Sequence, residues 1–258
     1  MALNPKVSII TVVKDDSSGL TRTLKSVLSQ DFKAYECLIV IGGSDLETYE
    51  VAKIFTLEDP RIRWMKEQST GIYGAMNDGI QNTSGIYMNF MNAGDSFAAK
   101  DSLGALVREL DGSRATLVIG RFQIDGNSRF DERGPIGEFD SFDFAFNRNW
   151  GNHQAMLFKR SESPLSYDIK YRIAADFKFV LQNLVKGVGF RTDCIVASIS
   201  SGGVSDINLV AGYLEKFKIR KEIFGSWKIG LVNYIWTIAA ISKRILKSIT
   251  KTLFPKSL

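Results

Sequence analysis

The sequence has little cysteine, one histidine, and neither an internal repeat nor a low-complexity segment. Its two cysteines, Cys37 and Cys194, stand far apart in apolar stretches, which excludes a disulfide framework and a cysteine-based metal site and predicts reduced structural thiols. Because no apolar run precedes the first predicted strand, we expect no secretory signal and a cytoplasmic protein.

The composition is that of an ordinary globular protein. Of 258 residues, 45% are hydrophobic and 24% are charged. This length and balance fit one large α/β domain, or one domain with an appendage, and they allow a substantial buried core.

Acidic residues are scarce at the C-terminal end. Residues 213–258 carry ten Lys or Arg but only two acids, Glu215 and Glu222, a net charge of +8. The whole chain is +5, so residues 1–212 sum to −3. The basic charge therefore belongs to a local appendage, which argues against nucleic acid as a partner of the core.

No apolar run in this tail reaches the length of about 20 residues that spans a bilayer. The longest, residues 229–241, has 13 residues. Basic residues and interfacial aromatics surround it, so we interpret it as a helix lying on an anionic membrane surface. The alternative is a core or oligomer-forming helix with a solvated basic end. The flanking and interfacial residues are Lys228, Lys243, Arg244, Lys247, Lys251, Trp227, Tyr234 and Trp236.

Strands and helices alternate through the first half. This order predicts a mostly parallel sheet with right-handed crossovers and flanking helices. Continuous β-branched runs such as residues 7–13 indicate strands buried on both faces. The predicted strands are residues 7–13, 35–41, 61–66, 86–91 and 116–122; the predicted helices are 18–30, 46–57, 72–81 and 101–110.

The second half is less regular. Residues 125–148 have no clean period and predict a long loop or small hairpin that carries acceptor specificity. Beyond it we expect strands at 154–158 and 194–198, a helix at 174–186, and helix from 207 onward. The predicted division is an α/β domain over 1–206 and a helical extension over 207–258.

Asp95 follows the strand predicted at residues 86–91 after a short exit, Asn92 to Gly94. Open α/β sheets place ligand chemistry just past the C-terminal ends of their strands. Asp95 is therefore a candidate ligand for a divalent metal, the usual partner of a nucleoside diphosphate. The alternative is that Asp95 only caps the next helix or turn.

Six stretches carry a family resemblance over residues 5–205: VSIITVVKDDSSGLTRTLKSVLSQ, YECLIVIGGSDLET, GIYGAMNDGIQNTSG, YMNFMNAGDSF, GNHQAMLFKR and YRIAADFKF. In their order and spacing they resemble a family 2 glycosyltransferase of the GT-A fold, of the bacterial polysaccharide-assembly type. The resemblance implies a nucleotide-sugar donor, a divalent cation (Mg²⁺ or Mn²⁺) and inversion at the anomeric carbon.

Three residues take roles from this resemblance. Asp95 matches the last acid of the DxD-type metal motif. Asp176 matches the catalytic base, and the start of a helix should keep it ionised; the alternative is a first-turn acid favoured by the helix dipole. His153 belongs to a His-Gln pair that the family places near the donor diphosphate or the acceptor, although a lone histidine is more often structural.

Four acidic positions of similar sequences are replaced, by Ile41, Ser69, Gly74 and Gly94. The carboxylate that usually reads the nucleotide base, at Ile41, is therefore absent. We expect backbone groups near the end of the first strand and several polar side chains to bind the donor instead. The candidate donor-binding residues are Thr11, Val13, Asp15, Ser44, Ser69, Asn77 and Asn92.

The resulting hypothesis is a hexosyl-transferring enzyme of cell-surface polysaccharide synthesis, such as lipopolysaccharide or capsule. It would transfer a sugar to a lipid-linked oligosaccharide at the inner face of the cytoplasmic membrane. One rival is a catalytically weak, membrane-bound partner of another transferase, motivated by the four missing acids. A second is a nucleotidyltransferase, which residues 14–19 match poorly because they form no Gly-rich, basic phosphate loop. The sugar, the linkage and the oligomeric state stay open.

Overall fold

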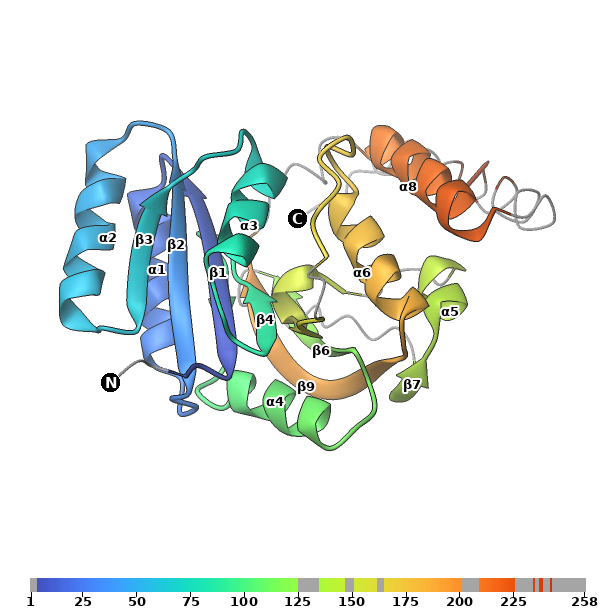
Figure 1. The fold of residues 1–258 in the computed structure, drawn as a ribbon, viewed down its shortest axis with the longest axis horizontal. Helices are drawn as coiled ribbons and strands as arrows, with labels where there is room; N and C mark the ends of the chain where they lie inside the picture. The colour runs from blue at the N-terminus through green and yellow to red at the C-terminus, as the bar shows by residue number, and fades with distance from the viewer. Residues whose placement is uncertain are drawn as a thin grey trace, which may run out of the picture.

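The computed structural model describes residues 4–124, 135–146, 151–161, 165–200 and 209–225, and the isolated positions 234, 237, 238 and 242. Within these residues a sheet of nine strands crosses the molecule in the order β3-β2-β1-β4-β8-β6-β9-β5, with β7 paired to β9 (Figure 1). The strands are β1 (Val7–Lys14), β2 (Tyr35–Gly42), β3 (Ile62–Lys66), β4 (Tyr87–Phe90), β5 (Ser96–Phe97), β6 (Leu117–Ile124), β7 (Gly137–Phe139), β8 (Met156–Lys159) and β9 (Gly189–Ile199).

The first four strands in space form the parallel half of the sheet. β1 pairs in parallel with β2 and with β4, and β2 pairs in parallel with β3. Every residue of β2 is buried, and so is every residue of β1 before Lys14. The prediction of strands buried on both faces is confirmed, because helices cover both sides of this half.

The other half mixes directions. β8 runs antiparallel to both β4 and β6, and β6 pairs in parallel with β9. The short β5 and β7 are antiparallel to β9. Most paired residues still lie in parallel ladders, so the predicted α/β class is correct. The short strand predicted at residues 194–198 is too short, because β9 begins at Gly189 and polar residues such as Arg191 and Thr192 interrupt its apolar pattern.

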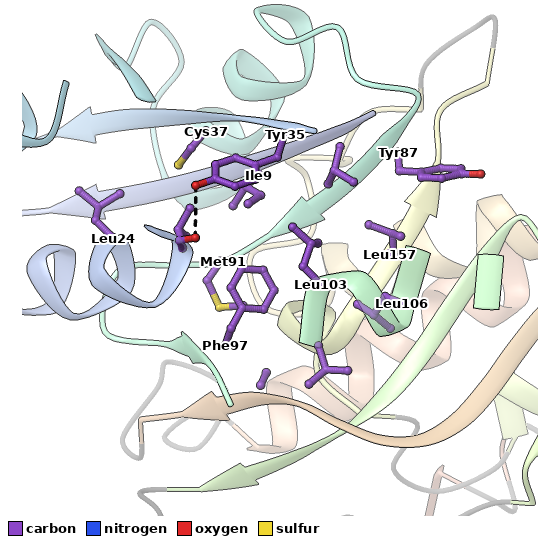
Figure 2. Close-up of a cluster of buried hydrophobic side chains, with 14 of the residues drawn as sticks. Ile9, Leu24, Tyr35, Cys37, Tyr87, Met91, Phe97, Leu103, Leu106 and Leu157 are labelled. Carbon is purple, nitrogen blue, oxygen red and sulfur yellow. Dashed lines mark hydrogen bonds between the residues drawn. The ribbon is translucent and has the colours of Figure 1, made fainter. Parts of the chain in front are cut away.

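Helices cover both faces of the sheet. One core cluster joins α1, α2 and α4 to one face, and a second joins α3, α5 and α6 to the other, with α8 beside α6 (Figure 1). Figure 2 shows the first cluster, which contains Leu24 of α1, Leu103 of α4, Ile9 of β1, and Met91, which directly follows β4. The helices are α1 (Ser17–Leu28), α2 (Leu46–Glu58), α3 (Ile72–Gln81), α4 (Ser102–Asp111), α5 (Ser141–Phe146), α6 (Ala175–Val185) and α8 (Leu209–Phe224).

Two predictions in the irregular region need correction. The loop or hairpin predicted at 125–148 contains β7 and α5, and β7 pairs with the distant β9 instead of with a hairpin neighbour. Residues 125–134 and 147–150 lie outside the described part. The strand predicted at 154–158 begins only at Met156, because residues His153–Ala155 form a short 3₁₀ helix, η1, in which the Ala155 N–H donates to the Asn152 carbonyl.

The C-terminal region is described only in part. α8 confirms the helix predicted after residue 207, and positions 234, 237, 238 and 242 are helical. The rest of the apolar stretch 229–241 lies outside the described residues. Of the helices in the described ranges, none combines the length and the apolar character needed to cross a bilayer.

Candidate active site

The strand order reverses between β1 and β4, because β2 and β3 continue outward from β1 while β4 lies on its other side. Ligands of open α/β sheets bind past the carboxyl ends of the strands at such a switch point. Asp15 follows the end of β1, and Asn92 and Asp95 follow the end of β4. These candidate residues therefore meet at the edge where the fold class places ligands.

Asp95 is held at this edge from two sides. Its Oδ2 accepts a 2.7 Å hydrogen bond from Gln154 Nε2, and its Oδ1 accepts a 3.0 Å bond from the Ser200 N–H. The residue is 7% exposed. Burial raises the pKa of Asp95 above its ordinary value, although the hydrogen bonds from Ser200 and Gln154 act against that change. The carboxylate thus links the end of β4 to η1 and to the end of β9.

Gly94 forms the turn before Asp95. Its φ is +94°, a left-handed conformation that glycine adopts without strain. Its carbonyl accepts hydrogen bonds from Ser200 Oγ at 2.7 Å and from Arg22 Nη1 at 3.2 Å. Arg22 Nη1 also lies 3.1 Å from Ser200 Oγ. The turn before Asp95 is therefore fixed by α1 and by the end of β9.

Two buried oxygens near Asp95 lack a partner among the described residues, Oδ1 of Asn92 and Oε1 of Gln154. A buried acceptor without a donor costs free energy, so each has the capacity to bind a cation or a donor group of a ligand. Within the described ranges no three His, Cys, Asp or Glu side chains cluster around a metal site. A hard divalent cation prefers carboxylate and amide oxygens, so Asp95 and Asn92 fit such an ion together with oxygens of a bound diphosphate.

His153 lies between the two halves of the site. Its Nε2 is 3.4 Å from Asn92 Nδ2, and its Nδ1 is 3.8 Å from Asp176 Oδ2. The imidazole packs edge-on against the Phe90 ring at 6.2 Å, and its side chain is 11% exposed. Phe90 belongs to β4, so the sheet itself fixes the ring. The structure brings His153 together with Asn92 and Asp176.

Asp176 stands in the first turn of α6, as the sequence predicts. Its side chain is 37% exposed, which leaves the carboxylate accessible. Burial alone raises the pKa of Asp176, but the His153 imidazole, the Lys216 charge and the Phe177 N–H outweigh it and hold the pKa below its ordinary value. The carboxylate is therefore ionised at neutral pH and able to accept a proton.

Asp15 fixes the turn that follows β2. Its Oδ1 accepts hydrogen bonds of 2.9 Å from the backbone N–H groups of Ser44 and Asp45. Its own φ of +50° is unusual for a residue other than glycine. The structure brings Asp15 and Ser44 together, with Asp15 shaping the turn and Ser44 exposed.

Ser69 is tied to the buried Asp78 of α3. Its N–H and its hydroxyl each donate a 2.8 Å hydrogen bond to the Asp78 carboxylate. The Ser69 backbone passes so close to Gly74 that an added Cβ there would lie 3.0 Å from it. A side chain at 74 would therefore press against the Ser69 backbone, which would have to move by a few tenths of an ångström.

Three other residues expected to bind the nucleotide-sugar donor are less accessible. Asn77 uses both ends of its amide on the backbone of Tyr167, at 2.7 and 2.9 Å. Thr11 and Val13 are buried in β1, and the Thr11 hydroxyl has no partner among the described residues. Asn77 therefore joins α3 to the segment before α6, and the side chains of Thr11 and Val13 point into the core.

Sequence reasoning missed several residues that build the site. Gln154 and Ser200 hold Asp95, while Arg22 and Thr23 of α1 hold the backbone around it, Thr23 Oγ1 at 2.6 Å from the Asp95 carbonyl oxygen. Gln154 had a signal, because it is the second member of the His-Gln pair. The others contact Gly94 or Asp95 across 72 to 105 residues and carry no local signal.

Comparison with known proteins agrees with this geometry. The model of the family described as Glycosyl transferase family 2 matches residues 8–164. An uncharacterized glycosyltransferase of Mycobacterium tuberculosis is 31% identical over 208 residues, which cover 79% of this chain and 78% of that protein. The PGL/p-HBAD biosynthesis glycosyltransferase of the same species is 29% identical over 180 residues, 68% of each chain.

Solved structures share the fold at low sequence identity. The 1–349 fragment of S. aureus TarS has a TM-score of 0.65 at 13% identity, covering 84% of this chain and 65% of that fragment. The mannosyltransferase PcManGT of Pyrobaculum calidifontis, in complex with GDP-Man and Mn²⁺, has a TM-score of 0.63 at 14% identity, covering 99% and 82%. The chain thus belongs to glycosyltransferase family 2 and has the GT-A fold of its nucleotide-sugar transferases.

Proposed function

We propose that the protein transfers a sugar from a nucleotide-sugar donor to an acceptor hydroxyl with inversion, and that Asp176 is the general base. The observation that carries this proposal is the accessible, ionised Asp176 carboxylate in contact with His153, which in turn contacts Asn92 beside Asp95. A proton acceptor thus lies on one side of the imidazole, and on the other side lie oxygens suited to a cation that would bind the donor diphosphate.

The reaction needs one proton transfer. The acceptor oxygen forms a bond to the anomeric carbon, and the bond from that carbon to the donor phosphate oxygen breaks. The hydroxyl proton passes to Asp176, and the electron pair of the broken bond leaves with the nucleoside diphosphate. A single base is sufficient for this displacement. Asp176 can act as that base because its carboxylate is ionised at neutral pH. His153 orients the Asp176 carboxylate from the side of the sheet.

A divalent metal would be held by Asp95 and Asn92 and would neutralise charge on the leaving diphosphate. Their oxygens are of the type that Mg²⁺ and Mn²⁺ prefer, and PcManGT was solved with Mn²⁺. Gln154 and Ser200 hold the Asp95 carboxylate in place through its two oxygens. Arg22, on the neighbouring Gly94 carbonyl, adds positive charge at this edge.

The donor nucleotide would lie along the ends of β1 and β2. Asp15 and Ser44 shape the turn there, and the backbone near Thr11 and Val13 supplies polar groups. The Ile41 side chain cannot donate or accept a hydrogen bond, so base selection falls to other groups at this edge. UDP-GlcNAc and GDP-Man, which are bound in TarS and PcManGT structures, are the first hexosyl donors to test.

The acceptor proposed is a lipid-linked oligosaccharide of cell-surface polysaccharide synthesis, reached at the inner face of the cytoplasmic membrane. Two features support membrane association through the C-terminal helices. Residues 213–258 carry a net charge of +8, and apolar or aromatic residues near them are exposed. Anionic lipid attracts such a segment. The exposed residues are Val210, Leu214, Tyr234 and Ile238.

Thermal unfolding with a panel of nucleoside diphosphates, with and without Mn²⁺, tests the donor site because a ligand of the native state raises the melting temperature. We expect one nucleotide to raise it only with Mn²⁺. Nucleoside diphosphate release from the matching sugar donor then tests transfer, with Asp176→Asn as the inactive variant. Nucleotide binding without transfer to any acceptor, or an Asp176→Asn variant as active as wild type, would overturn the assignment of the base.

The rival proposal is a catalytically weak partner of another transferase. The four replaced acids favour it, as does the engagement of both Asp95 oxygens in hydrogen bonds within the chain. It predicts no thermal shift with any nucleotide in the presence or absence of Mn²⁺. The same panel therefore separates the two proposals in one experiment.

A further inference from the structure

The loop before α6 is held by a carboxylate from α8. Glu215 accepts hydrogen bonds from three consecutive backbone N–H groups, those of Arg172 at 3.0 Å, Ile173 at 2.9 Å and Ala174 at 2.8 Å. The N-cap residue of α6, Ala174, makes no side-chain capping bond of its own. Glu215 thus caps α6 from a helix about 40 residues further along the chain.

We propose that Glu215 is a positioning residue for Asp176, and that α8 is part of the catalytic unit. This inference rests on the proposed role of Asp176 as the general base. Asp176 stands two residues after the last amide that Glu215 binds, so the loop that Glu215 fixes sets the place and direction of the first turn of α6.

The electrostatics of a helix start favour this arrangement. Backbone N–H groups at the beginning of a helix have no partner within the helix, and a carboxylate there is stabilised by the helix dipole. Without Glu215, the three amides would need water or a different loop conformation. A charged acceptor that binds three donors restricts the loop more than a single neutral cap does.

A second element holds the same loop from the other side. The Tyr73 hydroxyl of α3 donates a 2.9 Å hydrogen bond to the Ile173 carbonyl. Ile173 therefore has its N–H bound by α8 and its carbonyl bound by α3. This leaves Ile173, three positions before the base, little freedom, and a general base requires a fixed position for productive geometry.

The rest of α8 is anchored well enough to act as a support. Ile219 is fully buried, and Arg220 donates a 2.6 Å hydrogen bond to the Ala145 carbonyl of α5. At its far end Glu222 accepts a 2.8 Å bond from the Tyr171 hydroxyl and pairs with Lys178 of α6. Glu215 and Glu222 thus join α8 to both sides of the start of α6.

These two glutamates provide a matched pair of variants. Glu215→Gln and Glu222→Gln remove the same charge from the same helix, but only the first contacts residues 172–174. We expect Glu215→Gln to lower kcat by about 10- to 100-fold, since small misplacement of a reacting group has effects of this size. The donor KM should stay at its wild-type value. Glu222→Gln should keep kcat within about 3-fold even when its melting temperature falls similarly.

An activity-independent measurement completes the test. Hydrogen–deuterium exchange of a peptide covering residues 172–178 should be faster in Glu215→Gln than in wild type or in Glu222→Gln, because three amides lose their charged acceptor. Glu215→Asp, which keeps the charge, should recover part of both the protection and kcat. Wild-type kcat in Glu215→Gln, or equal losses in both Gln variants, would overturn the inference.

The outcome is separable from that of the proposed function. If Asp176→Asn abolishes transfer while Glu215→Gln is fully active, the base assignment stands and the positioning role fails. If Asp176→Asn retains wild-type transfer, the assignment of the base fails, whatever the exchange data show. Altered exchange in Glu215→Gln with unchanged kcat would mean that the cap is structural only, and this result would also overturn the inference.

Discussion

The Nδ1 atom of His153 lies 3.8 Å from the Oδ2 atom of Asp176, so the single histidine of the chain contacts the proposed base. The same ring packs against Phe90 of β4. The base on α6 is therefore connected to the central sheet through one side chain. His153 contacts the Asp176 carboxylate directly, and Glu215 holds the loop that leads into the helix of Asp176.

Replacing His153 by Ala should lower kcat/KM by about 10- to 100-fold, less than the loss of a group that itself transfers the proton, because His153 orients the base. The imidazole is one cause that keeps the pKa of Asp176 low, so its loss should raise that pKa. A base must be deprotonated to act, and the acid limb of the pH–kcat/KM profile should therefore move to higher pH. An unchanged acid limb would show that His153 does not influence the base.

Lys216→Met should shift the same limb in the same direction without touching the His153 contact. The positive charge of Lys216 lowers the pKa of Asp176, and Met preserves most of the side-chain volume. Lys218→Met serves as the control, because Lys218 lies on the same helix and is exposed. Profiles measured at two ionic strengths should show the Lys216 effect shrinking with salt. Equal shifts in both variants would point to the general charge of α8 instead.

Asp95→Ala and Asp95→Asn should separate structure from metal binding. Ala leaves Gln154 Nε2 and the Ser200 N–H without an acceptor, which should cost about 1–3 kcal/mol of the free energy of unfolding. Asn keeps an acceptor for Ser200, and the Gln154 amide can turn its unpartnered Oε1 toward the new NH₂ group. Urea denaturation should therefore find Asp95→Asn close to wild type.

Both Asp95 variants should lose the Mn²⁺-dependent thermal shift with nucleotide. Neither Ala nor Asn supplies the negative charge that a hard divalent cation requires from the single protein carboxylate. An Asp95→Asn variant that keeps the full Mn²⁺-dependent shift would remove Asp95 from the metal site and leave it only a structural role.

Glu36 should make folding sensitive to acid. Its side chain is 9% exposed and accepts hydrogen bonds from Ser8 Oγ at 2.8 Å, the Ser84 N–H at 2.6 Å and Arg63 at 2.8 Å. Burial raises the pKa of Glu36, but these donors outweigh burial and lower the pKa overall. The stabilisation is therefore present above the unfolded pKa of about 4.3 and is lost as pH falls through the lower folded value.

Glu36→Gln should accordingly reduce the free energy of unfolding at pH 7 by about 1–3 kcal/mol. The difference from wild type should shrink as the pH is lowered below about 4, because wild-type Glu36 then becomes neutral too. Urea denaturation across this pH range measures this difference in the free energy of unfolding. The exposed Glu50, which pairs with Lys53 one helix turn away, provides a Gln control with no measurable effect. A constant difference at all pH values would exclude ionisation of Glu36 as the cause.

The C-terminal segment should bind anionic vesicles. With a net charge of +8 over residues 213–258, the full chain should sediment with phosphatidylglycerol-containing vesicles and not with neutral phosphatidylcholine, and salt should weaken the binding. Replacing Lys243, Arg244, Lys247 and Lys251 by Gln should abolish sedimentation. Binding that persists in this variant would exclude these four charges as its cause, and no binding by the wild-type chain would favour the alternative of a core or oligomer-forming helix.

Local patterns predicted the parallel half of the fold well. Residues 7–13 and 35–41 are continuous apolar runs, and each becomes a buried strand at nearly the predicted bounds. The position of Asp95 after a strand and that of Asp176 at the start of a helix also follow from neighbouring residues. In each case the signal lies within a few positions of the element that it describes.

Contacts across the mixed half were not predictable in this way. Gln154 and Ser200 reach Asp95 only because β8 and β9 lie where they do in the strand order. The His-Gln pair marks Gln154 as a candidate but not its contact with Asp95, and no local feature marks Ser200. The strand predicted at residues 194–198 covers only part of β9, because polar residues interrupt the apolar pattern of β9. The hydrogen bonds that Glu215 accepts are unpredictable for the same reason. The three backbone N–H groups that donate them lie on the loop before α6, which comes near Glu215 only because α8 packs on α6.

Because Ser200 binds Asp95 across 105 residues, we expect the edge of the sheet around Asp95 to be completed late in folding. Ser200 stands 105 residues after Asp95, so during synthesis the nascent protein carries Asp95 without this partner until β9 has emerged from the ribosome. Contacts of such separation form late, because the intervening chain must first be ordered. An unfinished chain should therefore leave nucleotide-sugar untouched, and affinity for the donor becomes a sign that the whole sheet has been assembled.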